Sequence, residues 1–111
     1  GIARANVYTL LGAQTEKFLR DLKVNLTFLG ADAIHPDGTV ANVNLEEVPV
    51  KQAMIEAGEK VVLLTDSSKF SITAFAKVCH IKQLHMLITD NGISNEIMNR
   101  FLDFGVQIKI A

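Results

Sequence analysis

The sequence is poor in the features that mark several large classes of protein. Its 111 residues carry a formal net charge of −1 and no basic helix, so the chain lacks the positive field that holds nucleic acid. No apolar run reaches membrane-spanning length. Cys79 is the single cysteine and cannot form an internal disulfide, as is usual in the reducing cytoplasm. We therefore expect a cytoplasmic domain that binds neither membranes nor, by itself, DNA.

What the chain does have is apolar content suited to a folded core. Apolar residues make up 49% of the sequence, more than in disordered chains, which fits one domain over residues 1–111. Position 1 is glycine, and the first methionine is Met54. We therefore expect a fragment of a longer protein, truncated at the N-terminus.

Apolar strands alternate with amphipathic helices over short connections. This order predicts an α/β fold with a mainly parallel, Rossmann-like sheet and flanking helices. Pro36-Asp37-Gly38 is a strong turn signal, and residues 71–80 are expected to form a loop with a short extended piece. The expected strands are Ala5–Leu11, Leu26–Leu29, Lys60–Thr65, Leu84–Thr89 and, at an edge, Val106–Ile110, and the expected helices are about 15–23, 49–57 and 94–104.

The start of the second helix has two interpretations. Asn44 and Glu47 have the spacing of a capping box, which would begin a helix there. Pro49 lies beyond the first turn from that cap and would remove a helical hydrogen bond. Either the first turn is irregular, or the regular helix runs from Pro49 to Ala57. We favour the second, with Gly58 ending the helix as a C′ glycine.

One strand ends in a dense group of polar side chains. The apolar run Val61–Thr65 is followed directly by Asp66-Ser67-Ser68-Lys69. Open parallel sheets bind ligands beyond the carboxyl ends of their strands, and these side chains suit an anionic, hydroxylated molecule such as a sugar phosphate. A polar turn that simply ends the strand, with Lys69 in solvent, is an equally good interpretation of this stretch alone.

Acidic residues follow three of the expected strands, at Asp32, Asp66 and Asp90. If the strands are parallel, the three carboxylates lie along the same rim of the sheet, which favours a binding site over unrelated loops. Asp90 is followed by Asn91-Gly92 and also fits a tight turn.

Asp32, Asp66 and Lys69 form the candidate site, to which Glu47 and Lys51 could add. Carboxylates can orient sugar hydroxyls, and an ammonium can meet a phosphate. The same groups could transfer protons in an aldose–ketose isomerisation. Glu47 and Lys51 are four residues apart, a spacing that equally fits an ordinary salt bridge on a helix surface.

Other reactive residue types form no catalytic or metal-binding pattern. The three histidines are scattered without the spacing of metal ligands. Ser67-Ser68 lacks the flanking glycines of a nucleophile elbow. Cys79 has apolar neighbours and is interpreted as a buried, inert thiol. We therefore expect no metal site and no cofactor.

Four blocks of the sequence resemble one protein family, the C-terminal effector-sensing domain of the DeoR family of bacterial transcription regulators. The resemblance covers essentially the whole chain and implies the fold of the sugar-phosphate isomerases and CoA transferases. It also implies that a phosphate loop and a helix-turn-helix DNA-binding domain lie upstream of Gly1. The blocks are Gly30-Ala31-Asp32, Asn44-Leu45-Glu46-Glu47, Val50-Lys51-Gln52-Ala53-Met54-Ile55 and Asp66-Ser67-Ser68-Lys69-Phe70.

The resemblance further implies a function and a set of site residues. It implies a homo-oligomeric regulator, not an enzyme, that binds a phosphorylated sugar or related metabolite and controls operator DNA through the missing N-terminal domain. Asp32 would bind sugar hydroxyls, Lys51 and Lys69 would face the anionic or polar end of the ligand, and Glu47 and Asp66 would complete the site. The implied ligand-binding set is Gly30, Asp32, Glu47, Lys51, Asp66, Ser67, Ser68 and Lys69.

Two other functions stay open on the sequence. The chain could be a fragment of a sugar-phosphate isomerase-like enzyme, which would convert its ligand. It could instead be an oligomerisation module that associates through the edge strand ending at Ile110.

Overall fold

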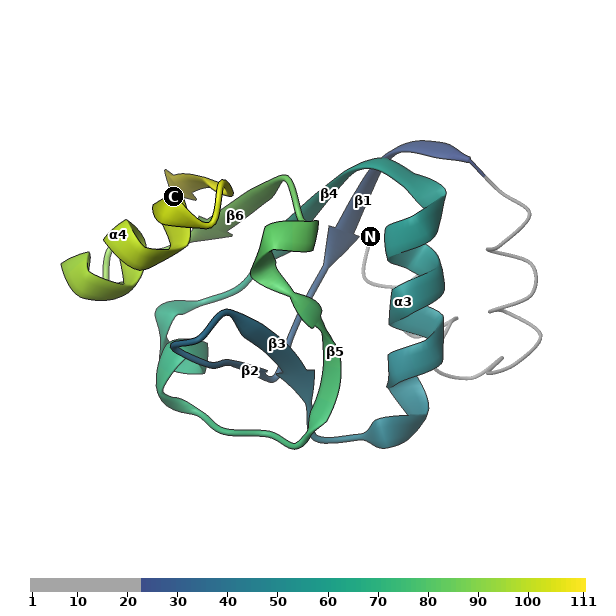
Figure 1. Ribbon diagram of the computed structural model, residues 1–111, viewed down its shortest axis with the longest axis horizontal. Coiled ribbons are helices and arrows are strands. Elements are labelled where there is room, and N and C mark those ends of the chain that lie inside the picture. Colours follow the sequence, from purple (N-terminus) through teal and green to yellow (C-terminus); the bar gives the residue numbers. More distant parts are fainter. Residues whose placement is uncertain (1–22) are drawn as a thin grey trace.

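The computed structural model describes residues 23–111, which contain a four-stranded parallel sheet of order β1-β4-β6-β7 (Figure 1). This confirms the predicted α/β class with a mainly parallel sheet, and β7 lies at an edge as expected. The strand expected at Ala5–Leu11 and nearly all of the helix expected at 15–23 lie outside the described residues. The four strands are β1 (Val24–Leu29), β4 (Gly58–Leu64), β6 (Met86–Thr89) and β7 (Gln107–Ile110).

A second, antiparallel sheet of order β2-β3-β5 was not predicted. The predicted turn Pro36-Asp37-Gly38 joins β2 to β3, with Gly38 at a φ of +94°. The extended piece expected within residues 71–80 is β5. Local patterns therefore indicated parts of this sheet but not the sheet itself, because β2 has only two residues and β5 pairs with β3, a strand far away in the sequence. Its strands are β2 (Ala33–Ile34), β3 (Thr39–Asn42) and β5 (Ala76–His80).

Helix α3 (Val48–Ala57) follows a short 3-10 helix, η1 (Leu45–Glu47). The Asn44 side chain accepts a hydrogen bond from the backbone N–H of Glu46 at 3.0 Å and so caps η1. Pro49 lies in the first turn of α3, where a missing N–H removes no helical hydrogen bond. Both interpretations of the sequence are therefore partly right: η1 is the irregular first turn, and the regular helix α3 begins next to Pro49.

Gly58 ends α3 at the predicted place but in a different conformation. Its φ of −87° and ψ of 132° are extended, so the prediction of a C′ glycine was wrong. A side chain at this position would run into the side chain of Thr27 on β1. Glycine is therefore needed for the close approach of β4 to β1, and α3 passes into β4 without a loop.

Helix α4 (Asn95–Asp103) confirms the helix predicted at 94–104. The Ser94 hydroxyl accepts a hydrogen bond from the N–H of Ile97 at 3.1 Å, as an N-cap does. Gly105, at a φ of +93°, follows the last turn and lets the chain enter β7.

The core lies between one face of the parallel sheet, α3, α4 and the antiparallel sheet. Leu63 and Leu87 on the central strands are 0% exposed, as is Phe101 on α4. The Phe101 ring lies 6.0 Å from the rings of both Phe70 and Phe104. Phe70 belongs to η2 (Ser67–Ser71), so the core connects α4 to the segment that follows β4.

The other face of the sheet is more open. The apolar run in β4 predicts a strand buried on both faces, which holds for Val61, Val62 and Leu63. Leu64 is 54% exposed, and Phe28 on the neighbouring strand is 55% exposed.

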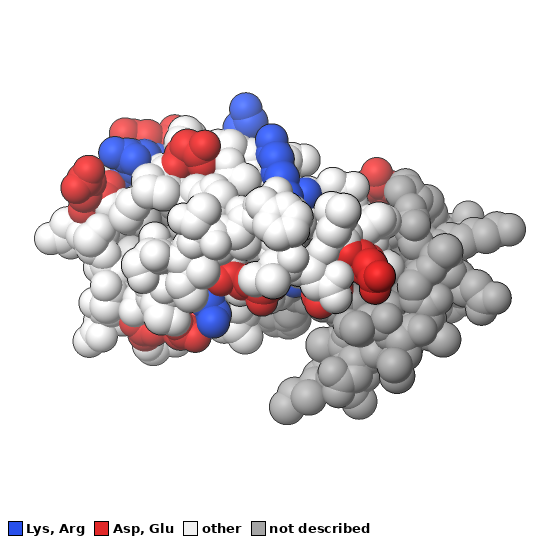
Figure 2. Space-filling view, turned by 90° about the horizontal axis from the view of Figure 1, so that it is seen from below, with Lys and Arg blue, Asp and Glu red and all other residues white. Residues whose placement is uncertain are grey.

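The surface carries no broad field of one charge on the face shown in Figure 2. Acidic and basic side chains both occur there, in places next to one another, and most of the visible surface is uncharged. This agrees with the formal net charge of −1. Within residues 23–111, no helix has the length and apolar character needed to span a membrane.

Candidate functional site

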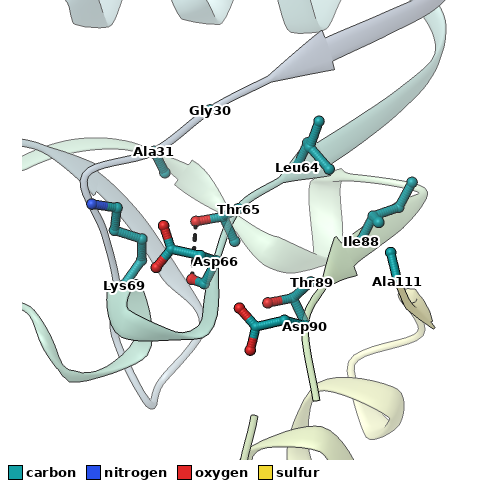
Figure 3. A pocket seen from close by; sticks show the side chains of 10 residues that line it. All are labelled: Gly30, Ala31, Leu64, Thr65, Asp66, Lys69, Ile88, Thr89, Asp90 and Ala111. Atoms are coloured by element: carbon teal, nitrogen blue, oxygen red, sulfur yellow. Dashed lines mark hydrogen bonds between the residues drawn. The ribbon is translucent and has the colours of Figure 1, made fainter. Parts of the chain in front are cut away.

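A pocket of about 450 Å³ lies at the carboxyl ends of β1, β4 and β6 (Figure 3). This is where open parallel sheets bind ligands, because the loops that leave adjacent strands diverge there. Its walls combine aliphatic, hydroxyl and charged side chains. The lining residues are Gly30, Ala31, Leu64, Thr65, Asp66, Lys69, Ile88, Thr89, Asp90 and Ala111.

The segment after β4 turns at once into the 3-10 helix η2, and Asp66 is its N-cap. The Asp66 carboxylate accepts hydrogen bonds from the Ser68 hydroxyl and from the Ser68 backbone N–H, the latter at 2.9 Å. These hydrogen bonds hold the pKa of Asp66 below its usual 3.8. Asp66 is therefore ionised at neutral pH and fixes the turn that presents Lys69.

Asp90, which follows β6, fixes the same segment from the other side. Its carboxylate accepts hydrogen bonds from the N–H of Ser67 at 2.9 Å and from the N–H of Gly92 at 2.8 Å. Hydrogen bonds from Ser67 and Gly92 hold the pKa of Asp90 below 3.8. A side chain at Gly92 would meet the Ser67 side chain, so glycine lets the loop after β6 approach η2.

Asp90→Asn is expected to reduce the loss of stability on acidification. Because the pKa of Asp90 is lowered by folding, its stabilisation is present above pH 3.8 and is lost as the pH falls below that value. The amide does not titrate there, so Tm should fall less between about pH 6 and about pH 3 in the variant than in the wild type. Asp103→Asn removes an exposed carboxylate at the end of α4, away from these hydrogen bonds, and is the control for the loss of one negative charge. An equal fall for Asp90→Asn would contradict this account.

Lys69 is the cationic side chain among the residues that line the pocket. Its ammonium points toward the Gly30–Ala31 end of the pocket in Figure 3. Within residues 23–111, no hydrogen bond or ion pair ties up this ammonium, and the side chain is only half-buried. Lys69 is thus free to bind an anionic group of a ligand.

Lys51 and Glu47 lie behind the pocket in an internal polar cluster with Asn42. Lys51 is 4% exposed, and its Nζ donates to the Gly30 carbonyl at 2.9 Å and to the Asn42 Oδ1 at 3.1 Å. Glu47 accepts from the Asn42 amide at 3.1 Å and lies 3.8 Å from Lys51 Nζ. Burial lowers the pKa of Lys51, an effect that the Glu47 charge opposes. These contacts brace the end of β1 beside Gly30.

Asp32 and the two serines also make internal contacts. Asp32 accepts a hydrogen bond from the N–H of Val43 at 2.8 Å, which ties the start of β2 to the end of β3. Ser67 and Ser68 donate to the two aspartates described above. Of the eight residues of the predicted set, the structure therefore brings Gly30, Asp66 and Lys69 together around the pocket.

The sequence prediction of a rim of carboxylates holds for Asp66 and Asp90, which both line the pocket. It missed the contribution of Thr65 and Thr89, the last residues before these aspartates. The signal was present, because these positions end two strands that the sequence placed in one parallel sheet. Their orientation toward the pocket required the strand register.

The histidines and Cys79 do not line the pocket. Within residues 23–111, no group of three His, Cys, Asp or Glu side chains could hold a metal ion. Two histidines take part in the antiparallel sheet region: His80 Nε2 is 2.7 Å from the Asp37 carbonyl, and His35 Nε2 accepts from the N–H of Ala74 at 3.2 Å. His85 Nδ1 accepts from the N–H of Val61 at 2.9 Å.

Cys79 is expected to resist thiol reagents while the domain is folded. It is 3% exposed on β5, and burial raises its pKa from 9.0 to about 11. This shift lowers the thiolate fraction about 100-fold near neutral pH, and burial adds a barrier to access. Labelling with an aromatic disulfide reagent should therefore be slow in native buffer and rapid in urea. Rapid labelling of the native protein would show that Cys79 is accessible.

These features define a class of α/β domain with a charged, hydroxyl-lined pocket beyond the ends of its parallel strands. The chain belongs to the DeoR family, because residues 1–91 match the family model described as the DeoR C terminal sensor domain. This confirms the resemblance inferred from the sequence. The domain is thus the sensor domain of DeoR-type transcriptional regulators, a family of regulators and not of enzymes.

Similar proteins that carry names are also transcriptional regulators. The chain is 30% identical over 108 residues to an Escherichia coli O157:H7 protein provisionally named an aga operon transcriptional repressor. It is 27% identical over 111 residues to the regulator GolR of Listeria innocua, and 27% identical over 102 residues to the glycerol-3-phosphate regulon repressor of Escherichia coli K12. These matches cover 97%, 100% and 92% of this chain but 40%, 44% and 40% of the relatives. The chain spans about two fifths of their length.

Proposed function

We propose that the pocket binds a phosphorylated sugar or a related phosphorylated metabolite as the effector of the regulator. The observation that carries this proposal is the Lys69 ammonium, which makes no hydrogen bond or ion pair with the described residues 23–111. It lies at one end of a pocket that also holds the Asp66 and Asp90 carboxylates. An ammonium can bind a phosphate as a point charge, and ionised carboxylates accept hydrogen bonds from sugar hydroxyls. A ligand with both groups satisfies both ends of this pocket.

The names of two relatives support the same ligand class. One is the glycerol-3-phosphate regulon repressor of Escherichia coli K12, and another, 25% identical over 97 residues, is the L-fucose operon activator of Haemophilus influenzae. Both names refer to genes for small polyhydroxylated molecules or their phosphates. By analogy, the effector of this chain belongs to that chemical group.

Effector binding would act on DNA through the rest of the regulator. A ligand shifts an equilibrium between two forms only by its difference in affinity for them. We propose that the intact cytoplasmic protein is a homo-oligomer whose N-terminal domain holds operator DNA, and that the effector favours one of two arrangements. In this proposal the whole of the chain, residues 1–111, belongs to the sensing domain.

A thermal-shift screen tests the proposal. The ligands are glycerol 3-phosphate, ribose 5-phosphate and further sugar phosphates, with the free sugars and inorganic phosphate as controls. They are tested on this chain and on a longer chain that includes the upstream residues. A ligand at about 100 times its Kd stabilises the folded state by about 2.7 kcal/mol, which raises Tm measurably. A phosphorylated ligand should exceed both of its controls.

Two outcomes of the screen would contradict the proposal. If no phosphorylated ligand stabilises either chain, the pocket does not serve this class of effector. If a sugar phosphate is converted to an isomer during incubation, the domain retains an enzymatic activity and the sensor assignment of this pocket fails. The recovered ligand is therefore analysed by NMR after each positive result.

A further inference from the structure

Thr89, the last residue of β6, has a buried hydroxyl without a hydrogen-bond partner. The residue is 3% exposed, and its Oγ1 is the side-chain oxygen or nitrogen within residues 23–111 that is buried and unpaired. Its backbone is ordinary for a parallel sheet, with the Thr89 carbonyl accepting from the N–H of Ala111 at 2.8 Å. The missing hydrogen bond of Thr89 therefore concerns its side-chain hydroxyl and not its backbone carbonyl.

An unpaired buried hydroxyl is unfavourable, because it loses its hydrogen bonds to water without gaining others. Valine has almost the same shape and would fill this position at the end of an apolar strand without that loss. A second buried threonine shows the usual arrangement: Thr27 is 7% exposed, and its hydroxyl donates to the Met54 carbonyl at 3.4 Å. The Thr89 hydroxyl thus has no evident role in stabilising the fold.

The position of the hydroxyl points to a role in binding. Thr89 lines the pocket, and in Figure 3 its oxygen and the Asp90 carboxylate both point from the end of β6 to the side on which Asp66 lies. Both aspartates are held ionised by their hydrogen bonds, so this part of the pocket repels a phosphate. A neutral hydroxyl group of a ligand can instead donate a hydrogen bond to a carboxylate, and it can donate to or accept from a threonine hydroxyl.

We propose that Thr89 Oγ1 binds a hydroxyl group of the effector and thereby fixes the orientation of the ligand in the pocket. The hydroxylated carbon chain lies between Thr89, Asp90 and Asp66, and the phosphate lies toward Lys69. This inference rests on the proposed function, because it concerns the same pocket. It adds a specificity-determining residue, which favours ligands with a hydroxyl at the end of the pocket away from Lys69.

Thr89→Val and Thr89→Ser test this inference by calorimetry with the most strongly bound of ribose 5-phosphate and glycerol 3-phosphate. We expect Thr89→Val to weaken binding about 3- to 10-fold, as for a lost hydrogen bond to a ligand hydroxyl. Thr89→Ser keeps the hydroxyl and should restore most of the affinity. Without ligand, Thr89→Val should be at least as stable as the wild type, because it removes an unpaired polar group.

Thr27→Val is the matched control, with the opposite expected pattern. Its hydroxyl has a partner within the fold, so the variant should lose stability without ligand and keep the wild-type affinity. Inorganic phosphate has no carbon-borne hydroxyl, so its affinity should be the same for the wild type and Thr89→Val. This comparison separates an effect on the hydroxyl end from one on the phosphate end.

The outcomes distinguish this inference from the proposed function. If the wild type binds a sugar phosphate and Thr89→Val binds it equally well, the role of Thr89 is wrong while the proposed function holds. A large loss of stability in ligand-free Thr89→Val would likewise overturn it, because the hydroxyl would then serve the fold. If no phosphorylated ligand of the thermal-shift screen binds the wild type, the proposed function fails, and the inference fails with it.

Discussion

Phe101→Ala is expected to lower the free energy of unfolding by about 3–5 kcal/mol, the usual loss for a buried phenylalanine. Phe101 is 0% exposed, and its ring lies 6.0 Å from those of Phe70 and Phe104. The substitution would leave a cavity where α4 meets the sheet and the segment after β4. Equilibrium unfolding in urea measures the change.

Leu102→Ala is the matched control, because Leu102 is the next residue of the same helix and is 48% exposed. It should cost less than about 1 kcal/mol. Similar losses for the two variants would contradict the described packing of α4. Phe101 packs against Phe70 in η2, the segment that also carries Lys69. Its replacement should therefore also weaken effector binding, because η2 loses part of the packing that positions it.

Lys69→Ala is expected to weaken effector binding about 10- to 100-fold, the equivalent of about 1.5–3 kcal/mol for a hydrogen bond to a charged group. The side chain makes no hydrogen bond or ion pair within residues 23–111, so Tm without ligand should stay close to the wild-type value. Isothermal titration calorimetry with the phosphorylated ligand found in the screen measures the affinity.

Lys82→Ala controls for the loss of a positive charge as such. Lys82 lies in η3 (Ile81–Gln83), is exposed and does not line the pocket. It should keep the wild-type affinity. If Lys69→Ala also keeps it, Lys69 does not bind the effector, and the phosphate has to be held elsewhere.

The parallel sheet could be predicted from the sequence because each strand carries its own signal. The run at Val61–Leu64 is apolar, its neighbours in the sheet are bounded by turn residues, and helix α4 has a serine cap and a following glycine. The antiparallel sheet could not be predicted from the sequence, because its strand pairing depends on contacts between distant segments. Gly58 shows the same limit: the sequence located the end of α3, but the reason for a glycine was the approach of Thr27.

The sequence could place a residue at the pocket only where that residue directly follows the end of a strand. Asp66 and Asp90 follow adjacent parallel strands, which is enough to bring them to one rim. Asp32 also follows the first strand, but three residues after its end, and there it binds the Val43 N–H. Lys51 shows that residue type alone does not identify a ligand-binding residue, because its ammonium donates hydrogen bonds to the Gly30 carbonyl and to Asn42 inside the fold. The roles of Lys51, Glu47 and Asp32 in binding stay predictions.

The central claim is that the effector binds at the carboxyl ends of β4 and β6, and NMR titration tests it most directly. Backbone amide shifts of the isotope-labelled protein are followed as a sugar phosphate is added. The account predicts the largest changes at Asp66, Lys69, Thr89 and Asp90, which surround the pocket. A second groove is lined by Gln52 and Glu56 of α3, Lys77 of β5 and Gln83 of η3. Changes centred on that groove would place the ligand elsewhere and contradict the account.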